Sequence, residues 1–161
     1  MAGARNDAQL RAMLEPALQK AVDYVVEKVW ENNIDAIEET VYGAGSPSVY
    51  SRTYSFEEAW DHESGGGGAI SAHFFYAPEH LTYHPSIVDN QDIRDGLVDI
   101  IYEGLAGHIL GEGFWTKKRN AFKTLEKKVG KAKIRQYFEE GMSAAGLTWK
   151  RRGGGITKGK I

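Results

Sequence analysis

The sequence predicts an α+β fold: a long N-terminal helix, an antiparallel sheet built on a glycine-tipped hairpin plus a C-terminal strand, and two to three further helices packed on that sheet. The chain has 161 residues, of which 42% are hydrophobic and 26% are charged, as expected for one folded domain. Apolar residues recur with a period of about 3.6 through residues 14–41 and again after residue 90. Between these regions, two segments of strand length flank four consecutive glycines. We therefore expect a single domain over residues 1–149 and a mobile, basic, glycine-rich tail over residues 150–161.

The N-terminal helix is predicted from apolar residues spaced three and four positions apart. They are Leu14, Leu18, Val22, Val25 and Val29, followed one position later by Trp30, Ile34, Ile37 and Val41. Proline lacks a backbone N–H and is best tolerated in the first turn of a helix. The helix is therefore expected to run from about Pro16 to Val41, with a separate shorter helical stretch from Asp7 to Leu14, and Gly43 should end it.

An extended segment and a hairpin are predicted next. Residues 49–54 are rich in aromatic and β-branched types, which favour extended backbone. Residues 56–63 and 69–76 then have strand length and are separated by Ser64 and the glycines 65–68, which predicts a hairpin with a flexible tip. Alternation along the second strand places two sets of side chains on opposite faces: Ile70, Ala72 and Phe74 against Ser71, His73 and Phe75.

A second amphipathic helix is expected after the hairpin. Asp89 or Asn90 can cap its first turn with a side-chain oxygen, and Gly111 and Gly113 should end the segment. Its predicted apolar stripe consists of Ile93, Leu97, Ile100, Ile101 and Leu105.

The basic C-terminal third predicts two short helices separated by Gly130. Thr116 is the expected cap of the first, and Gly146 has the position of a helix C-terminal glycine. The residues expected to face inward are Phe122, Leu125 and Val129 on the first helix and Ile134, Phe138 and Met142 on the second. Residues 147–149, Leu-Thr-Trp, form a candidate last strand that could pair with the hairpin.

Charge is divided unevenly along the chain, although the net charge is only −2. Residues 1–115 carry 6 Lys+Arg and 19 Asp+Glu, whereas residues 116–161 carry 14 and 3. This asymmetry predicts either a partner at one end, an acidic surface or nucleic acid, or self-assembly in which basic and acidic faces meet. The alternative is that the basic helices fold back on the acidic ones within one chain.

Composition excludes several classes of protein. There is no cysteine, which excludes a disulfide scaffold, a zinc site with cysteine ligands and a thiol nucleophile. No uninterrupted apolar run approaches the ~20 residues that span a bilayer, and the first residues lack the apolar core of a signal peptide. We therefore expect a soluble protein of intracellular origin, without a membrane partner.

The sequence carries no convincing catalytic or cofactor motif. Four histidines lie close together, but prolines bracket the last two and no His-Glu-x-x-His arrangement is present. These histidines are His62, His73, His80 and His84. The glycine run leads into a strand and lacks the Gly-Lys-Ser/Thr ending of a phosphate loop. We expect no enzymatic activity, no cofactor, no metal and no small-molecule substrate.

The order of parts resembles a known family. The string Pro-Ser-Val-Tyr-Ser-Arg-Thr-Tyr at residues 47–54 follows the long helix and a Gly/Pro turn. Gly-Phe-Trp at residues 113–115 then opens the basic helix pair, which ends in Gly146 and Leu147. In this order, residues 16–149 resemble the tail-completion or head-tail joining (neck) proteins of tailed bacteriophages. The glycine run at residues 65–68 departs from the family pattern.

The resemblance implies a structural virion protein synthesised in the host cytoplasm. It implies a ring of identical subunits, expected to be a hexamer, at the head-proximal end of the tail. Such a ring ends growth of the tail tube as a tail terminator and joins the tail to the connector. Connector and tail-tube proteins would then be its partners, and its role would be assembly.

Candidate contact residues follow from this interpretation. A subunit or partner interface is expected at Tyr50, Arg52, Tyr54, Gly65, Gly66, Gly67 and Gly68, although the tyrosines and the arginine could equally serve core packing and a surface ion pair. Contacts with an acidic partner, or with DNA passing through the ring, are expected at Lys150, Arg151, Arg152, Lys158 and Lys160.

The alternative function is a small protein that binds nucleic acid without sequence preference through its basic third. The density of positive charge favours binding to the phosphates of a nucleic acid. Because no base-reading motif is present, the binding would rest on these charges and would be sensitive to salt. The cations concerned begin with Lys117, Lys118, Arg119, Lys123, Lys127, Lys128, Lys131, Lys133 and Arg135. The same lysines could instead form an ordinary solvated helix surface.

Overall fold

The computed structural model describes residues 6–45, 54–65, 69–82, 91–104 and 117–147. Its elements, in chain order, are α1 (Asp7–Ile37), η1 (Glu38–Tyr42), α2 (Ser55–Glu58), β1 (Trp60–Ser64), β2 (Ala72–Tyr76), η2 (Pro78–His80), α3 (Gln91–Glu103), α4 (Ala121–Lys128) and α5 (Lys131–Ala144). A long N-terminal helix, an antiparallel strand pair and further helices confirm the predicted α+β class.

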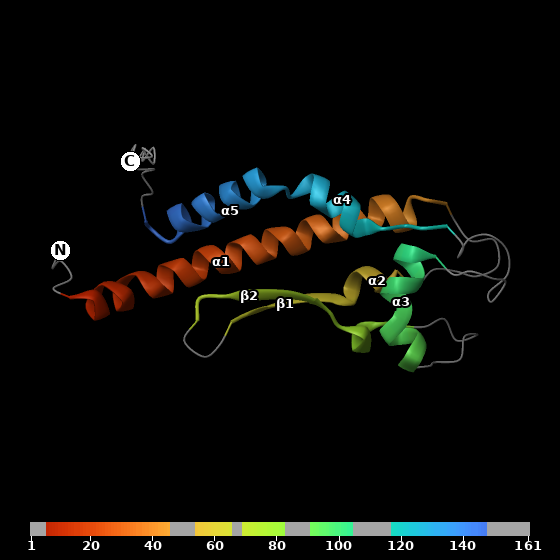
Figure 1. Cartoon of the computed structure of the whole chain (residues 1–161), viewed down its shortest axis with the longest axis horizontal. Coiled ribbons are helices and arrows are strands. Elements are labelled where there is room, and N and C mark those ends of the chain that lie inside the picture. The colour runs from red at the N-terminus through yellow and green to blue at the C-terminus, as the bar shows by residue number, and fades with distance from the viewer. Residues whose placement is uncertain (1–5, 46–53, 66–68, 83–90, 105–116, 148–161) are drawn as a thin grey trace, which may run out of the picture.

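Helix α1 is the axis of the molecule (Figure 1). Helices α4 and α5 lie along one side of it, and the β1–β2 hairpin with α2 and α3 lies on the other side. At 1.5 Å per residue, the 31 residues of α1 span about 46 Å. The α4–α5 pair and the hairpin with α2 and α3 are therefore arranged around one continuous helix.

Helix α1 begins earlier than predicted. The side chain of Asn6 caps it by accepting a hydrogen bond from the Gln9 backbone N–H at 2.9 Å. The prediction of a break before Pro16 is wrong, because α1 runs through this proline without interruption. Pro16 and Ala12 are both exposed, so water can hydrate the Ala12 carbonyl that the proline leaves without an N–H donor.

The end of α1 widens into the short π-helix η1. The Gly43 N–H donates to the Glu38 carbonyl at 2.7 Å, and a Cβ at Gly43 would lie 2.6 Å from the Glu39 carbonyl oxygen. Only glycine fits this close approach, which confirms Gly43 as the end of the helical region.

The predicted hairpin is confirmed, with one correction. Strands β1 and β2 pair antiparallel from Trp60 opposite Tyr76 to Ser64 opposite Ala72. The expected start of the first strand is wrong, because residues 55–58 form the helical turn α2 after a left-handed Tyr54 (φ 61°). Within β2 the predicted faces are confirmed: one is half-buried and consists of Ala72, Phe74 and Tyr76, and the other is exposed and consists of His73 and Phe75. Ile70, which is predicted on the same face as Ala72 and Phe74, precedes the strand and is exposed.

A cluster of aromatic rings forms the centre of the core. Trp60 stacks on Phe74 with ring centroids 5.1 Å apart and meets Phe122 edge-on at 5.3 Å. Tyr102 contacts Phe122 at 5.0 Å, and Phe56 contacts Tyr102 at 6.1 Å. These contacts join α2, the hairpin, α3 and α4 to one another.

Helix α3 ends at Glu103, where Gly104 adopts a left-handed conformation (φ 75°). Leu97 and Ile100 are half-buried and Ile101 is buried, as predicted, but Ile93 is 37% exposed. The predicted caps at residues 89 and 90, and Leu105, Gly111 and Gly113, lie outside the described residues.

The two C-terminal helices confirm the break at Gly130 but change some of the inward positions. Asn120 caps α4 by accepting from the Lys123 N–H, and Thr116, the expected cap, lies outside the described residues. The inward residues Leu125, Val129 and Met142 are buried and Phe138 is half-buried, as predicted, whereas Phe122 is 41% exposed even though its ring packs on the core.

The prediction for Ile134 is wrong: Ile134 is 41% exposed and Tyr137 is buried in its place. The reason is that Gly141 packs against Ala21 of α1, which sets the rotation of α5. Gly146 (φ 80°) ends the helix region as predicted, with the Leu147 N–H bonded to the Met142 carbonyl at 2.9 Å.

Two predicted elements lie only partly within the described residues. Within the described residues the sheet has two strands, and Leu147 is not in either of them. The rest of the predicted C-terminal strand, residues 148 and 149, lies outside the described ranges, as do residues 49–53 of the predicted extended segment and the basic tail.

Candidate assembly surfaces

The charge asymmetry of the sequence becomes a separation in space. Residues 120–147, which include α4 and α5, carry six Lys or Arg against three Glu. The three cations that precede them lie beside the end of α3, where the Arg119 N–H donates to the Ile101 carbonyl at 3.0 Å. On the other side of α1, residues 54–65, 69–82 and 91–104 carry nine Asp or Glu against one Arg. Opposite charges therefore lie on opposite sides of the long helix (Figure 1).

The two helices of the basic side carry four exposed cations, which we call the basic face: Lys123 and Lys127 on α4, and Lys131 and Arg135 on α5. Each pair is four residues apart, a spacing that aligns side chains along a helix. On α4 the buried residues Ala121 and Leu125 occupy the opposite side of the helix, so packing directs the two lysines to solvent.

The acidic side presents a stripe along α3. The residues of this acidic stripe are Asp92, Asp95, Asp99 and Glu103, and all four are exposed. Their spacing of three and four residues keeps them on one face of the helix, while Ile101 is buried on the opposite face. Arg94 holds α3 against the preceding turn by donating to the carbonyls of Pro78 at 3.1 Å and Leu81 at 3.0 Å.

Some basic residues do fold back on acidic ones within the chain. Lys118 lies 3.0 Å from the Glu103 carboxylate, and Lys128 lies 3.1 Å from Glu39. The hydrogen bond and the charge of Lys118 lower the pKa of Glu103. The fold-back interpretation therefore accounts for these two lysines, while the four cations of the basic face lie exposed to solvent.

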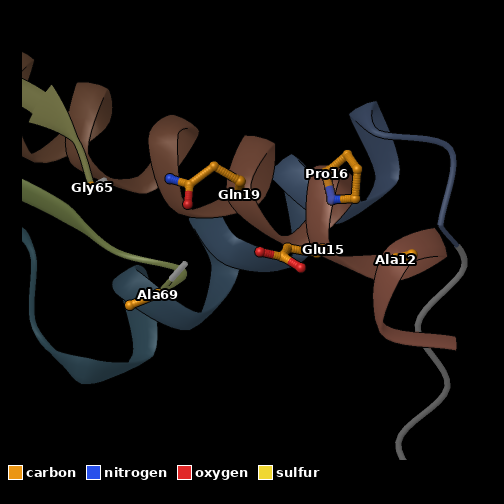
Figure 2. Close-up of a pocket in the computed structure, with 6 residues that line it drawn as sticks. All are labelled: Ala12, Glu15, Pro16, Gln19, Gly65 and Ala69. Carbon is orange, nitrogen blue, oxygen red and sulfur yellow. The ribbon is translucent and has the colours of Figure 1, made fainter. Parts of the chain in front are cut away.

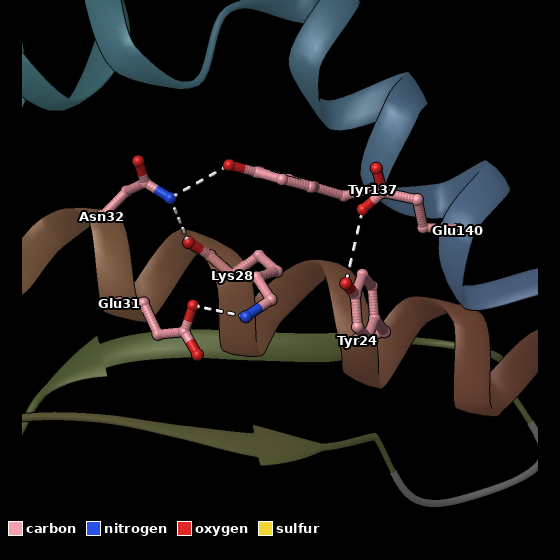
Figure 3. Close-up of polar contacts among 6 residues, drawn as sticks. All are labelled: Tyr24, Lys28, Glu31, Asn32, Tyr137 and Glu140. Atoms are coloured by element: carbon pink, nitrogen blue, oxygen red, sulfur yellow. Dashed lines mark hydrogen bonds and ion pairs between the residues drawn. The ribbon is translucent and has the colours of Figure 1, made fainter. Parts of the chain in front are cut away.

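Polar contacts between α1 and α5 fix the position of the basic side (Figure 3). The Tyr24 hydroxyl donates to Glu140 at 3.3 Å. Asn32 Nδ2 donates to the Tyr137 hydroxyl at 3.1 Å and to the Lys28 carbonyl at 2.7 Å. Since these bonds connect side chains more than 100 residues apart in sequence, they hold α5 in one orientation on α1.

Asn33, next to the bonded Asn32, is fully buried, and neither polar atom of its side chain has a hydrogen-bond partner among the described residues. An unbonded buried amide costs about 1–3 kcal/mol. We expect Asn33→Leu to raise the free energy of unfolding by about 1–2 kcal/mol in urea denaturation. The matched change Asn32→Leu removes real hydrogen bonds and should lower it by about 1 kcal/mol. Equal effects of the two substitutions would contradict this assignment.

The contact residues predicted from the sequence are only partly described. Tyr54 is 52% exposed, and its ring meets Tyr42 edge-on at 4.7 Å. Gly65 bonds back to the Ser71 carbonyl at 2.7 Å, which closes the described part of the hairpin. The remaining predicted contacts lie outside the described residues, so they stay predictions: Tyr50, Arg52, Gly66, Gly67, Gly68, Lys150, Arg151, Arg152, Lys158 and Lys160.

Sequence reasoning missed the acidic stripe, although its signal was present. The i, i+3, i+7, i+11 spacing of the stripe could be read from the sequence directly. Its exposure could not, because that depends on which side of α3 packs against the core.

A pocket of about 300 Å³ lies between the first turns of α1 and the hairpin (Figure 2). Its lining residues are Ala12, Glu15, Pro16, Gln19, Gly65 and Ala69. Gln19 Nε2 is already used, since it donates to the Ser71 carbonyl and to Asp23, both at 2.8 Å. With one carboxylate among small residues and an amide, this lining offers no nucleophile paired with a base.

The histidines do not converge within the described ranges. His62 packs edge-on against Trp30 at 5.6 Å, and His73 lies opposite Glu63 on the neighbouring strand. Over the described part of the chain, no group of three or more His, Asp or Glu side chains is arranged to hold a metal ion. A search of the same residues finds no helix with the length and hydropathy needed to cross a bilayer.

Comparison with known proteins gives no family model, no curated protein and no solved structure that matches the chain. A proposal of function therefore rests on the residues of this chain and on the geometry of its two charged surfaces.

Proposed function

We propose that this protein is a structural subunit at the head-tail interface of a tailed bacteriophage, where copies assemble into a ring that joins the tail to the connector. The observation that carries the proposal is the separation of opposite charges across α1. In a ring, each subunit presents two different surfaces to its two neighbours. Complementary charge on those surfaces favours the correct register and speeds association.

The sequence resemblance supplies the biological setting. The order of the long helix, the hairpin, the middle helix and the basic helix pair is the order on which the resemblance to neck proteins rests, and the described elements follow it. The hexameric state, the position in the neck and the connector and tail-tube partners come from that resemblance and belong to the proposal. The role proposed is assembly, without catalysis, cofactor or metal.

The test is deletion of the coding sequence from the phage genome that carries it. We expect filled heads and separate tails to accumulate unjoined, and supply of the wild-type protein in trans should restore infectious particles. Electron microscopy of the lysate and labelling of the protein in purified particles provide the readout. Joined, infectious particles without the protein would contradict the proposal.

The exposed basic face also favours a second candidate, binding of nucleic acid through its phosphates. About four phosphate contacts would give a slope near −3.6 for the logarithm of affinity against the logarithm of salt concentration. A short duplex titrated by fluorescence anisotropy measures this slope. Binding with that slope, weakened in the Lys127→Gln and Lys131→Gln double variant, would favour this candidate, and no binding at low salt would exclude it.

A further inference from the structure

We propose that the acidic stripe of α3 docks on the basic face of α4 and α5 of a second copy of this chain. This inference rests on the proposed function and identifies the surfaces by which one subunit meets the next. The contact is heterologous, because each copy uses its α3 on one neighbour and its α4–α5 on the other.

Both surfaces run along helix axes. On α3, Asp95 and Asp99 are exposed at the centre of the stripe and lie about 6 Å apart along the helix, while Glu103 at its end is paired with Lys118 of the same chain. On the other surface, Lys123 and Lys127 span about 6 Å of α4 and Lys131 and Arg135 span about 6 Å of α5, with the break at Gly130 between the two pairs. The spacing of Asp95 and Asp99 therefore matches that of either pair of cations on a second copy.

An exposed apolar side chain borders the basic face. Ile134 of α5 is 41% exposed and lies three residues after Lys131, a spacing that makes the two side chains neighbours on the helix surface. Interfaces commonly combine a small apolar centre with a polar rim. Docking on the basic face would remove Ile134 from water, which adds to the attraction between the charges.

The second copy is favoured over an intramolecular contact and over nucleic acid. Within one chain, the stripe and the face lie on opposite sides of α1, and the Tyr102–Phe122 ring contact fixes the end of α3 against the start of α4 (Figure 1). Nucleic acid would satisfy the basic face alone and be repelled by the acidic stripe. A second copy supplies the complement of both surfaces.

The test uses charge reversal on each surface of the full-length chain. Asp95→Lys with Asp99→Lys reverses the two central charges of the stripe, and Lys127→Glu with Lys131→Glu reverses the two central charges of the face. Each double variant then sets like charges against each other, which should weaken self-association by about 100-fold or more. Mixing the two double variants restores opposite charges at every contact, so the mixture, and the quadruple variant, should assemble as the wild type does.

The measurement is mass by sedimentation velocity and light scattering at high protein concentration, at an ionic strength of about 0.01–0.05 M, where screening is weakest. Reversals of exposed charges on α1 serve as matched controls and should leave assembly unchanged: Glu15→Lys with Asp35→Lys, and Arg11→Glu with Lys20→Glu. Salt of about 0.5 M should weaken the wild-type assembly.

Two results would overturn the inference. One is a wild-type chain that stays monomeric under all these conditions, and the other is reversed variants that assemble as well as the wild type. The second result, with the protein still found in the neck of purified particles, would reject these surfaces and leave the proposed function standing. Absence of the protein from particles would reject the proposed function by a separate measurement.

Discussion

Trp60→Ala is expected to lower the free energy of unfolding by about 3–5 kcal/mol, the range typical of a large aromatic residue removed from a core. Trp60 is only 5% exposed, and its ring contacts Phe74, Tyr76, Phe56 and Phe122. The substitution leaves a cavity where the hairpin, α2 and α4 meet. Urea denaturation followed by far-ultraviolet circular dichroism measures the loss without relying on tryptophan fluorescence.

Phe75→Ala is the matched control for this prediction. Phe75 lies on the same hairpin, next to Phe74, which stacks on Trp60. Its side chain is on the opposite face of β2 and is 37% exposed. Its removal should cost about 1–2 kcal/mol, less than the loss of Trp60, since more than a third of its surface is already exposed to water. A similar loss in both variants would mean that the rings around Trp60 do not form the centre of the core.

Gly141→Val is expected to lower the free energy of unfolding by about 2–3 kcal/mol through overpacking. A Cβ at Gly141 would lie 2.8 Å from Ala21 Cα, 3.0 Å from the Ala21 carbonyl oxygen and 3.1 Å from Tyr24 Cβ. Two of these atoms belong to the backbone of α1, so the helices must move apart. The bonds from Asn32 to Tyr137 and from Tyr24 to Glu140 would then lengthen together.

Gly96→Val provides the comparison, because Gly96 is also within a helix and a Cβ there meets nothing within 4 Å. It should change stability by less than about 0.5 kcal/mol, since valine and glycine differ little in helix propensity. Thermal and urea denaturation of both variants separates packing from propensity. Equal destabilisation would show that α1 and α5 do not pack closely at Gly141.

Local sequence patterns predicted the elements better than their faces. The 3.6-residue period identified the region of α1, but the proline rule placed its start too late. A proline inside a helix loses one backbone hydrogen bond, and α1 nevertheless continues through Pro16 from its cap at Asn6. On α5 the apolar pattern predicted Ile134, Phe138 and Met142 as the inward residues. In the structure Gly141 packs against Ala21 of α1, which turns α5 so that Tyr137 is buried and Ile134 is exposed. The sequence pattern could not show this contact, because it joins residues far apart in the chain.

The assembly surfaces show the same limit. The division of charge between the two parts of the chain was evident from the sequence, and so was its compatibility with self-assembly. The sequence could not show that α3 and the α4–α5 pair lie on opposite sides of α1, or that Asp95 and Lys127 are exposed; these features are seen only in the folded structure. Placement of this kind follows from tertiary packing, which short-range patterns do not encode.

The uneven support of α1 has a mechanical consequence. The first buried side chain in the helix is Ala21, so about 20 Å of α1 precedes its first buried position. At the opposite end the aromatic rings join α2, both strands, α3 and α4 into one stiff block. A force applied near the exposed Leu10 and Met13 would therefore reach the rest of the molecule through two contacts of α1: the Gln19 hydrogen bond to the Ser71 carbonyl of the hairpin and the packing of Ala21 on Gly141 of α5.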